Sequence, residues 1–232
     1  DNKLLFFTTS PRTPAKMIPE IQLLHENFSG LSWNKSTQEQ FIDKLAQSDF
    51  FEGKGSPTDK AFSARDRINR APKALGFINL KPHIELTEAG IAFVYGKRPQ
   101  EIFLRQLLKF QLPSPYHVEH QNIIGTFCIR PYLEILRLVR ELEYITFDEF
   151  KIFAVQMTDY HKFNTIKESI LCFRQGKEEN KGQYKRFVNS VWENAILEIH
   201  SDRIAAGKTR TRETNDASLK KFIATQKSNM RD

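Results

Sequence analysis

Residues 61–77 carry a helical pattern that constrains the fold of this chain more than any other stretch. Small and apolar residues recur there at spacings of three and four, so they share one helical face that can pack on a core. These inward residues are Ala61, Ala64, Ile68, Ala71 and Leu75. The opposite face and its flanks are basic and polar, and they carry Arg65, Arg67, Asn69, Arg70 and Lys73. The pattern predicts an amphipathic helix with one charged, outward side.

The outward side has the composition of a DNA-reading surface. Arg and Asn suit bidentate hydrogen bonds with guanine and adenine edges, and Lys suits phosphate. A basic helical face is also commonly just solvated, so this helix by itself leaves both interpretations open. Pro72 favours a kink or an end of the helix near Arg70 or Ala71.

Two capping patterns predict helix starts upstream. Ser-Thr-Gln-Glu at residues 36–39 is a capping box, and it predicts a helix with Phe41, Ile42 and Leu45 inward. Ser-Pro-Thr-Asp at residues 56–59 repeats the pattern with proline at the first helical position. The basic helix is therefore the second of a pair.

A small hairpin follows the basic helix. Residues 77–80 and 84–86 are typical of two strands, a turn joins them at Pro82, and Thr87 begins another helix. Helix, helix, strand, turn, strand is the order of a winged helix-turn-helix, in which the second helix enters the major groove. The predicted fold class is mainly α with small β wings.

The amino-terminal stretch carries a stiff arginine loop. Pro11 and Pro14 hold the backbone extended or turned around Arg12, so Ser10, Arg12 and Lys16 could brace a DNA groove or backbone. The same residues are equally typical of the start of a helix over residues 16–26.

The chain divides into three predicted parts: residues 1–115 as a winged-helix module, 116–206 as a second helical module, and 207–232 as a basic tail or the start of a further module. The boundary between the first two parts is placed within a proline-rich linker at residues 112–117. The tail places Lys208, Arg210 and Arg212 between hydroxyl side chains, and all of these groups can bond phosphate oxygens. A disordered basic tail is the alternative.

The second module is predicted from helical periodicity. Residues 132–142 place Leu133, Leu136, Val139 and Arg140 in period, and a capping box at residues 146–149 opens a helix over residues 150–157. Residues 163–173 and 184–205 continue as long helices. Their predicted inward residues are Ile166, Ile170, Phe187, Val191, Ala195 and Ile199.

Composition limits the partners and the compartment. The net charge of +7 and the pI near 9.3 favour a polyanionic partner. Cys128 and Cys172 are expected to be buried thiols in a reducing cytoplasm, and no apolar run approaches the roughly 18 residues of a membrane span.

No catalytic constellation emerges from the sequence. His117 and His120 lack cysteine partners and belong to a predicted loop. Two Glu-x-Lys pairs, at residues 149–151 and 179–181, match the local sequence pattern of a metal-dependent nuclease site. Side chains two positions apart on a helix point to different sides, so we interpret both pairs as chance matches. We therefore predict no catalytic residue and no metal site in this chain.

Three segments together resemble the amino-terminal half of the AlwI-like type IIS restriction endonucleases, a group that includes nicking enzymes. They are residues 10–12 (Ser-Pro-Arg), residues 61–67 leading to Leu-Gly-Phe at 75–77, and residues 86–90 (Leu-Thr-Glu-Ala-Gly) through Arg98-Pro99 to residues 103–109 (Phe-Leu-Arg-Gln-Leu-Leu-Lys). The resemblance covers residues 10–117 well and becomes thinner over residues 118–232.

The resemblance implies a bacterial, cytoplasmic restriction-modification enzyme whose amino-terminal winged-helix units, similar in plan to FokI, read a short asymmetric site in double-stranded DNA. It implies a separate nuclease domain that uses magnesium, so no cofactor is expected in this chain. By that comparison the chain stops short of the nuclease, whether it is itself an enzyme stays open, and its partners are DNA and the nuclease domain or small subunit of the parent enzyme. We expect a monomer on DNA. A winged-helix regulator or partner-binding module is the alternative.

Overall fold

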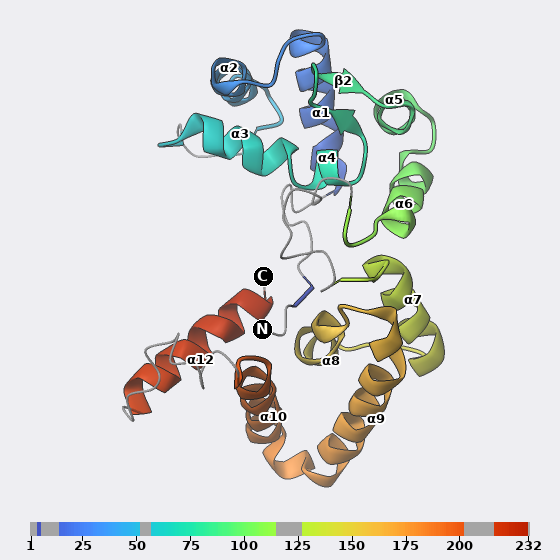
Figure 1. Cartoon of the computed structure of the whole chain (residues 1–232), viewed down its shortest axis with the longest axis vertical. Helices are drawn as coiled ribbons and strands as arrows, with labels where there is room; N and C mark the ends of the chain where they lie inside the picture. Colours follow the sequence, from blue (N-terminus) through green and yellow to red (C-terminus); the bar gives the residue numbers. More distant parts are fainter. Residues whose placement is uncertain (1–3, 6–13, 52–56, 115–126, 202–215, 232) are drawn as a thin grey trace. The chain divides into compact units, whose positions relative to one another are not determined.

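The computed structural model describes residues 4–5, 14–51, 57–114, 127–201 and 216–231, and within them it is mainly α-helical with one two-stranded sheet (Figure 1). The mainly helical class with a small β element is confirmed. The chain divides into two compact units, residues 7–110 and residues 111–232 with 1–6. The predicted boundary at 115/116 lies outside the described residues.

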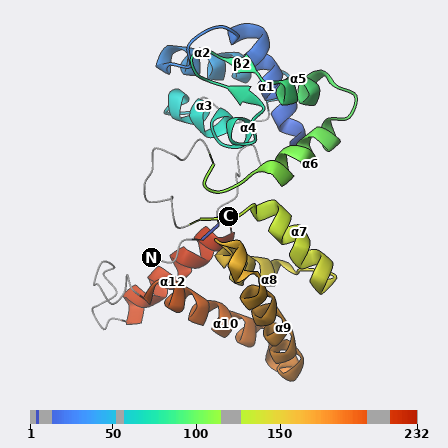
Figure 2. The ribbon, with the colours of Figure 1, turned by 45° about the vertical axis from the view of Figure 1, so that its right-hand side comes forward.

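In its described part, the unit of residues 7–110 begins with four helices, continues with a hairpin and ends with two further helices. Its elements are α1 (Pro14–Phe28), α2 (Lys35–Ala46), α3 (Lys60–Ile68), α4 (Ala71–Ala74), β1 (Ile78–Asn79), β2 (Glu85–Leu86), α5 (Glu88–Tyr95) and α6 (Pro99–Lys109). The two strands are antiparallel, with Ile78 opposite Leu86. Helices α2 and α3 lie side by side in both ribbon views (Figure 2).

Asx side chains cap the helix pair, and this corrects two predicted starts. Asn34 caps α2 by accepting a hydrogen bond from the amide of Thr37 at 3.1 Å, so the helix begins before Ser36. Asp59 caps α3 by accepting from the amide of Phe62 at 2.8 Å, so proline 57 precedes the helix instead of opening it. A short Asx side chain reaches the first free amides from just outside the first turn, which places each start at the residue after it.

The predicted inward face of the basic stretch is confirmed, because Ala61, Ala64, Ile68, Ala71 and Leu75 are all buried. Helix α3 ends at Ile68, and α4 restarts at Ala71 with proline in its first turn, as the proline pattern predicts. Helices α3 and α4 therefore share an apolar side that packs on the core and a polar side that faces outward.

The described parts of the unit of residues 111–232 are mainly helical, with short extended segments that pair through bridges at Leu112–Ile129 and Cys128–Asp159. Its elements are α7 (Pro131–Leu142), α8 (Phe147–Ile152), η2 (Ala154–Gln156), η3 (Tyr160–Lys162), α9 (Phe163–Glu179), η4 (Lys181–Gln183), α10 (Tyr184–Ile199) and α12 (Asp216–Arg231). Residues 216–231, predicted as part of a basic tail or a further module, form a helix that packs on α10 and α8. Its Met230 joins a core with Ile152, Phe173 and Trp192.

Several local predictions for this unit can be compared with the structure. The capping box at Thr146 is confirmed, since its hydroxyl accepts from the amide of Glu149 and its own amide donates to the Glu149 carboxylate at 2.8 Å. The helix predicted over residues 132–142 is confirmed as α7, but the residues in the predicted period do not form its buried side, because Leu133 and Leu136 are 42% and 48% exposed while Leu138 is buried.

The long helices α9 and α10 follow their predicted period, shifted by one position in α10. Ile166, Ile170 and Ile199 are buried as predicted. In α10 the buried side chains besides Ile199 are Val188, Trp192 and Ile196, and the predicted Phe187, Val191 and Ala195 pack at the margin of the same core. Both cysteines, Cys128 and Cys172, are exposed thiols, so their predicted burial is wrong. Among the helices of the described residues, none combines the length and the apolar character needed to cross a membrane.

Candidate nucleic-acid interface

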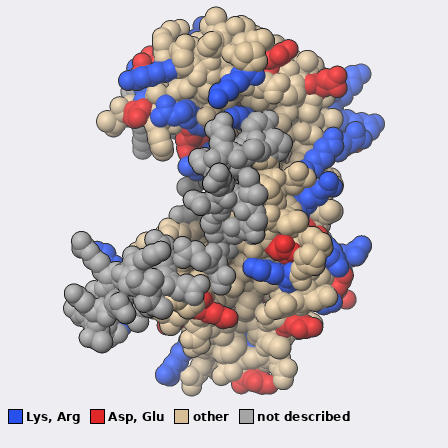
Figure 3. Space-filling model, in the orientation of Figure 1, with Lys and Arg blue, Asp and Glu red and all other residues tan. Residues whose placement is uncertain are grey.

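The outward side of α3 presents a mixed aromatic and basic surface. Phe62 is 58% exposed, and Arg65 and Arg70 are exposed one and two turns further on. Beside this surface lies an open groove of about 700 Å³, lined by Lys35, Glu39, Asp59, Lys60 and Arg65 among others. Figure 3 shows this unit from one side, with basic and acidic side chains intermingled on its surface. The groove is therefore polar and of mixed charge.

Arg65 is held in place by α2. Its Nη1 donates a hydrogen bond to Oε1 of Gln38 at 2.9 Å, and Gln38 is itself buried and donates to the backbone carbonyl of Trp33 at 3.0 Å. One corner of the guanidinium is thus fixed while the side chain as a whole stays exposed. A planar cation that is oriented before its ligand arrives loses less conformational entropy on binding.

Asn69 is held by the same tryptophan. Nε1 of Trp33 donates to Oδ1 of Asn69 at 2.9 Å, and an indole is only a donor, so the oxygen of the amide must face it. The ring of Trp33 packs edge-on against Phe41 with centroids 5.9 Å apart. The oxygen of Asn69 is therefore engaged by Trp33, while its Nδ2 donor is not used in this hydrogen bond.

Arg67 turns inward. Its Nη1 donates to Oε1 of Glu20 on α1, and its guanidinium lies 5.3 Å from the ring centroid of Phe51. Glu20 is 4% exposed, and burial raises its pKa more than Arg67 and Lys16 lower it, so this pKa lies above its usual value. The pair ties α3 to α1, which is a structural role that the sequence pattern did not indicate for Arg67.

The remaining predicted residues are more scattered. Arg70 forms an exposed ion pair with Asp66 one turn earlier, at 2.7 Å, while Lys73 on α4 is half-buried and Lys16 on α1 is exposed. The structure thus gathers Arg65, Asn69 and Arg70 along one stretch. Ser10, Arg12, Lys208, Arg210 and Arg212 lie outside the described residues.

Sequence reasoning missed the residues that position this surface. Gln38, Trp33 and Glu20 are 27, 36 and 47 positions away from Arg65, Asn69 and Arg67, respectively. No periodicity links such distant positions. Only the burial of polar side chains at Glu20 and Gln38 marks them, and that is visible only in three dimensions.

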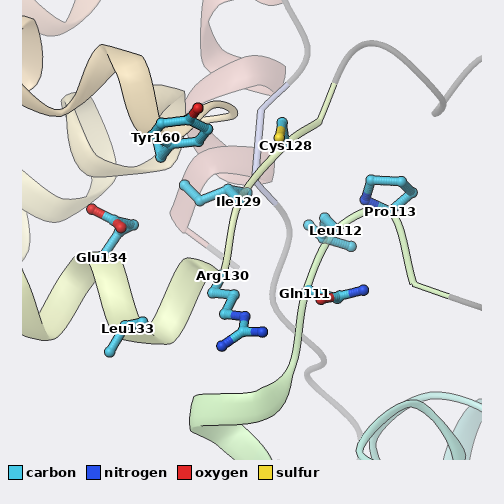
Figure 4. Close-up of a pocket in the computed structure, with 9 residues that line it drawn as sticks. All are labelled: Gln111, Leu112, Pro113, Cys128, Ile129, Arg130, Leu133, Glu134 and Tyr160. Carbon is cyan, nitrogen blue, oxygen red and sulfur yellow. The ribbon is translucent and has the colours of Figure 1, made fainter.

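The second unit contains a separate cavity of about 370 Å³ (Figure 4). Leu112 and Ile129 line it from two extended segments that exchange backbone hydrogen bonds of 2.8 and 3.0 Å. Figure 4 shows Glu134 and Tyr160 on the far side of Ile129 from Leu112. None of the predicted site residues lines this cavity, so it is not part of the candidate interface.

In the described parts of the chain, no group of three or more His, Cys, Asp or Glu side chains is placed to hold a metal ion. We therefore assign no magnesium ligands to the described residues.

Comparison with known families identifies the chain. The family model described as AlwI restriction endonuclease matches residues 73–226, more than half of the 232 residues. The chain belongs to the AlwI restriction endonuclease family. A comparison with curated proteins gives no match. Membership in the AlwI family supports a restriction enzyme with DNA as its partner, and it does not favour the regulator alternative.

The extent of the AlwI match differs from the resemblance found in the sequence. We expected the strongest likeness over residues 10–117, but the match begins at Lys73 and ends at residue 226, within α12. It includes the second half of α4, the hairpin, α5 and α6, and it leaves out α1 to α3. The AlwI family is therefore shown, while the role of α3 rests on its own geometry.

Proposed function

We propose that this chain is the DNA-recognition part of a type IIS restriction or nicking endonuclease and that the outward side of α3 reads a short asymmetric site. Family membership supports restriction of DNA. The observation that carries the finer proposal is the network in which Trp33 and Gln38 fix Asn69 and Arg65 on an exposed helix. Side chains whose hydrogen-bonding groups are oriented in advance are suited to discriminating base edges.

A winged helix-turn-helix suits the order of elements. Helices α1, α2 and α3 precede the β1–β2 hairpin, which takes the place of the wing. The connection between α2 and α3, residues 47–59, is longer than the 3–4-residue turn of a simple helix-turn-helix. We therefore propose a winged helix with an extended connection and, by resemblance, a FokI-like plan with further units downstream.

The side chains divide into three roles. Arg65 and the Nδ2 donor of Asn69 read base edges, while Arg67 supports the helix from inside. Arg70 contacts phosphate, because an exposed pair such as Arg70–Asp66 contributes only about 0–1 kcal/mol and is easily exchanged. Further phosphate contacts are proposed for Lys16, Lys73, Ser10, Arg12, Lys208, Arg210 and Arg212.

Cleavage is proposed to come from a magnesium-dependent nuclease domain or subunit acting with this chain. An asymmetric site needs no two-fold symmetry, so the chain binds it as a monomer. Incubation of the chain with plasmid and magnesium should leave the plasmid supercoiled. A nicked or linear product would contradict this division of labour.

Selection of bound duplexes from a random pool tests the proposed function. We expect enrichment of one short asymmetric motif, bound at one chain per duplex. A palindrome bound by two chains would favour a dimeric regulator instead, and a pool that stays random would refute sequence reading altogether.

A further inference from the structure

Helix α6 carries a second basic surface, on the side of the helix that faces solvent. Its exposed cations, with those of the turn before it, are Lys97, Arg98, Arg105 and Lys109, and we call this set the α6 ridge. The single acidic residue within residues 97–109 is Glu101. This stretch therefore carries four basic side chains against one acidic side chain.

The opposite side of α6 is anchored to the fold. Nε2 of Gln106 donates to the backbone carbonyl of Leu75 at 2.7 Å, and the ring of Phe103 stacks on Phe93 and Phe77 with centroids 5.9 and 6.3 Å away. Gln106 also crowds Gly76, where an added Cβ would come within 3.2 Å of its Nε2. The ridge is thus mounted on a fixed helix.

The ridge is not neutralised by its neighbours. In the described part of the chain, Lys97, Arg105 and Lys109 form no ion pair. Arg98 pairs with Glu101 at 3.2 Å, but Arg98 is 76% exposed in its side chain, so this pair is weak. On α3 and in the turn after it, by contrast, Arg65, Arg67 and Arg70 each have a partner inside the protein. Unpaired cations on a rigid helix are complementary to a polyanion.

We propose that the α6 ridge binds the phosphate backbone of duplex DNA, as a contact surface separate from the base-reading side of α3. The proposal rests on the proposed function and adds a surface to it. The ridge lies within the residues that match the family, whereas α3 does not. Phosphate contacts fix register and orientation and carry no sequence information directly.

The salt dependence of DNA binding tests this proposal. The double variant Arg105→Ala/Lys109→Ala should lower the slope of log affinity against log salt by about two, since each phosphate contact contributes about 0.9 on duplex DNA. Affinity should fall by the same factor for the selected motif and for a random duplex. Both side chains are exposed, so the thermal midpoint should not change.

The matched control is Lys185→Ala/Arg186→Ala, which removes two exposed positive charges from α10 and changes the net charge equally. It should leave the slope unchanged. The swap Arg105→Lys/Lys109→Arg keeps both charges and should retain the wild-type slope.

Three results would overturn the proposal. An unchanged slope in Arg105→Ala/Lys109→Ala, with the motif preference of the wild type intact, would remove the α6 ridge and leave the proposed function standing. Equal losses in the variant and in the α10 control would show a general charge effect. A wild-type chain that binds no duplex at any salt concentration would refute the proposed function as well.

Discussion

The buried ion pair between Arg67 and Glu20 gives a prediction that separates structural from DNA-reading arginines. Arg67→Met removes the guanidinium and leaves the Glu20 carboxylate 4% exposed, with Oε2 already lacking a partner among the described residues. Removing one member of a buried pair typically costs 3–5 kcal/mol. Arg67 is 27% exposed, which allows some solvation, so we expect a loss of about 3 kcal/mol in the free energy of unfolding.

The pH dependence of this loss has a defined sign. Because the pKa of Glu20 is raised in the native state, the native state binds its proton more tightly than the unfolded chain does. The contribution of Glu20 to the free energy of unfolding is therefore fully present below the ordinary carboxyl pKa and is lost as the pH rises through the native value. Arg67→Met removes a positive charge that lowers this pKa, so the decline should extend to higher pH in the variant.

Urea unfolding at several pH values measures both effects. The chain has two tryptophans, Trp33 in one unit and Trp192 in the other, so a Trp192→Phe background reports on the unit of residues 7–110 alone. The double variant Glu20→Met/Arg67→Met should recover most of the lost stability. If Arg67→Met costs less than about 1 kcal/mol, or lowers the motif preference of the folded protein, Arg67 is not the internal support described above.

Three further predictions concern other residues. Asn69→Asp keeps the oxygen that accepts from Trp33 but loses the Nδ2 donor, so the free-energy preference for the motif over a random duplex should fall by about 1–3 kcal/mol. A binding titration that gives the wild-type preference would place base reading elsewhere. Burial acts to raise the pKa of Glu149, but hydrogen bonds from Arg174 and Thr146 and the charge of Arg174 outweigh burial, so the pKa of Glu149 is lowered. The contribution of Glu149 to stability is therefore lost as the pH falls through its native pKa. Arg174→Met should cost about 3–5 kcal/mol in the free energy of unfolding and flatten this acid dependence, as followed by Trp192 fluorescence in urea. Lys208→Ala should weaken binding to every duplex equally and lower the salt slope by about one, and a change confined to the motif would contradict a phosphate contact.

Local patterns predicted the elements whose burial follows from one clear period. In α3, the small residues at spacings of three and four leave a single possible inward face, and Ala64 and Ile68 are fully buried there. The capping box at Thr146 was likewise readable, because both of its hydrogen bonds join residues three apart.

Helix α7 shows where periodicity becomes ambiguous. Leucines lie on two sides of this helix, so Leu133 and Leu136 fit one inward stripe and Leu138 and Leu142 fit another. Only the neighbouring helices decide which stripe is buried. Helix α9 is one of these neighbours: the guanidinium of Arg137, next to Leu138, lies 3.8 Å from the ring centroid of Phe163 on α9.

The candidate site was predictable in composition but not in the roles of its members. The pattern placed Arg65, Arg67 and Asn69 on one charged surface, and it gave no means of ranking them. Their partners lie on α1, on α2 and in the loop before α2, and such long-range pairs leave no local trace. The distinction between an arginine that faces solvent and one that faces a buried carboxylate therefore required the fold.

The most direct test of the central claim is the affinity of Arg65→Lys for the selected motif and for a random duplex across a range of salt concentrations. Lysine keeps the charge but not the planar fork that hydrogen-bonds a guanine edge. We predict a loss of about 1–3 kcal/mol on the motif alone, with an unchanged salt slope. A motif-to-random ratio equal to that of the wild type would contradict base reading by α3.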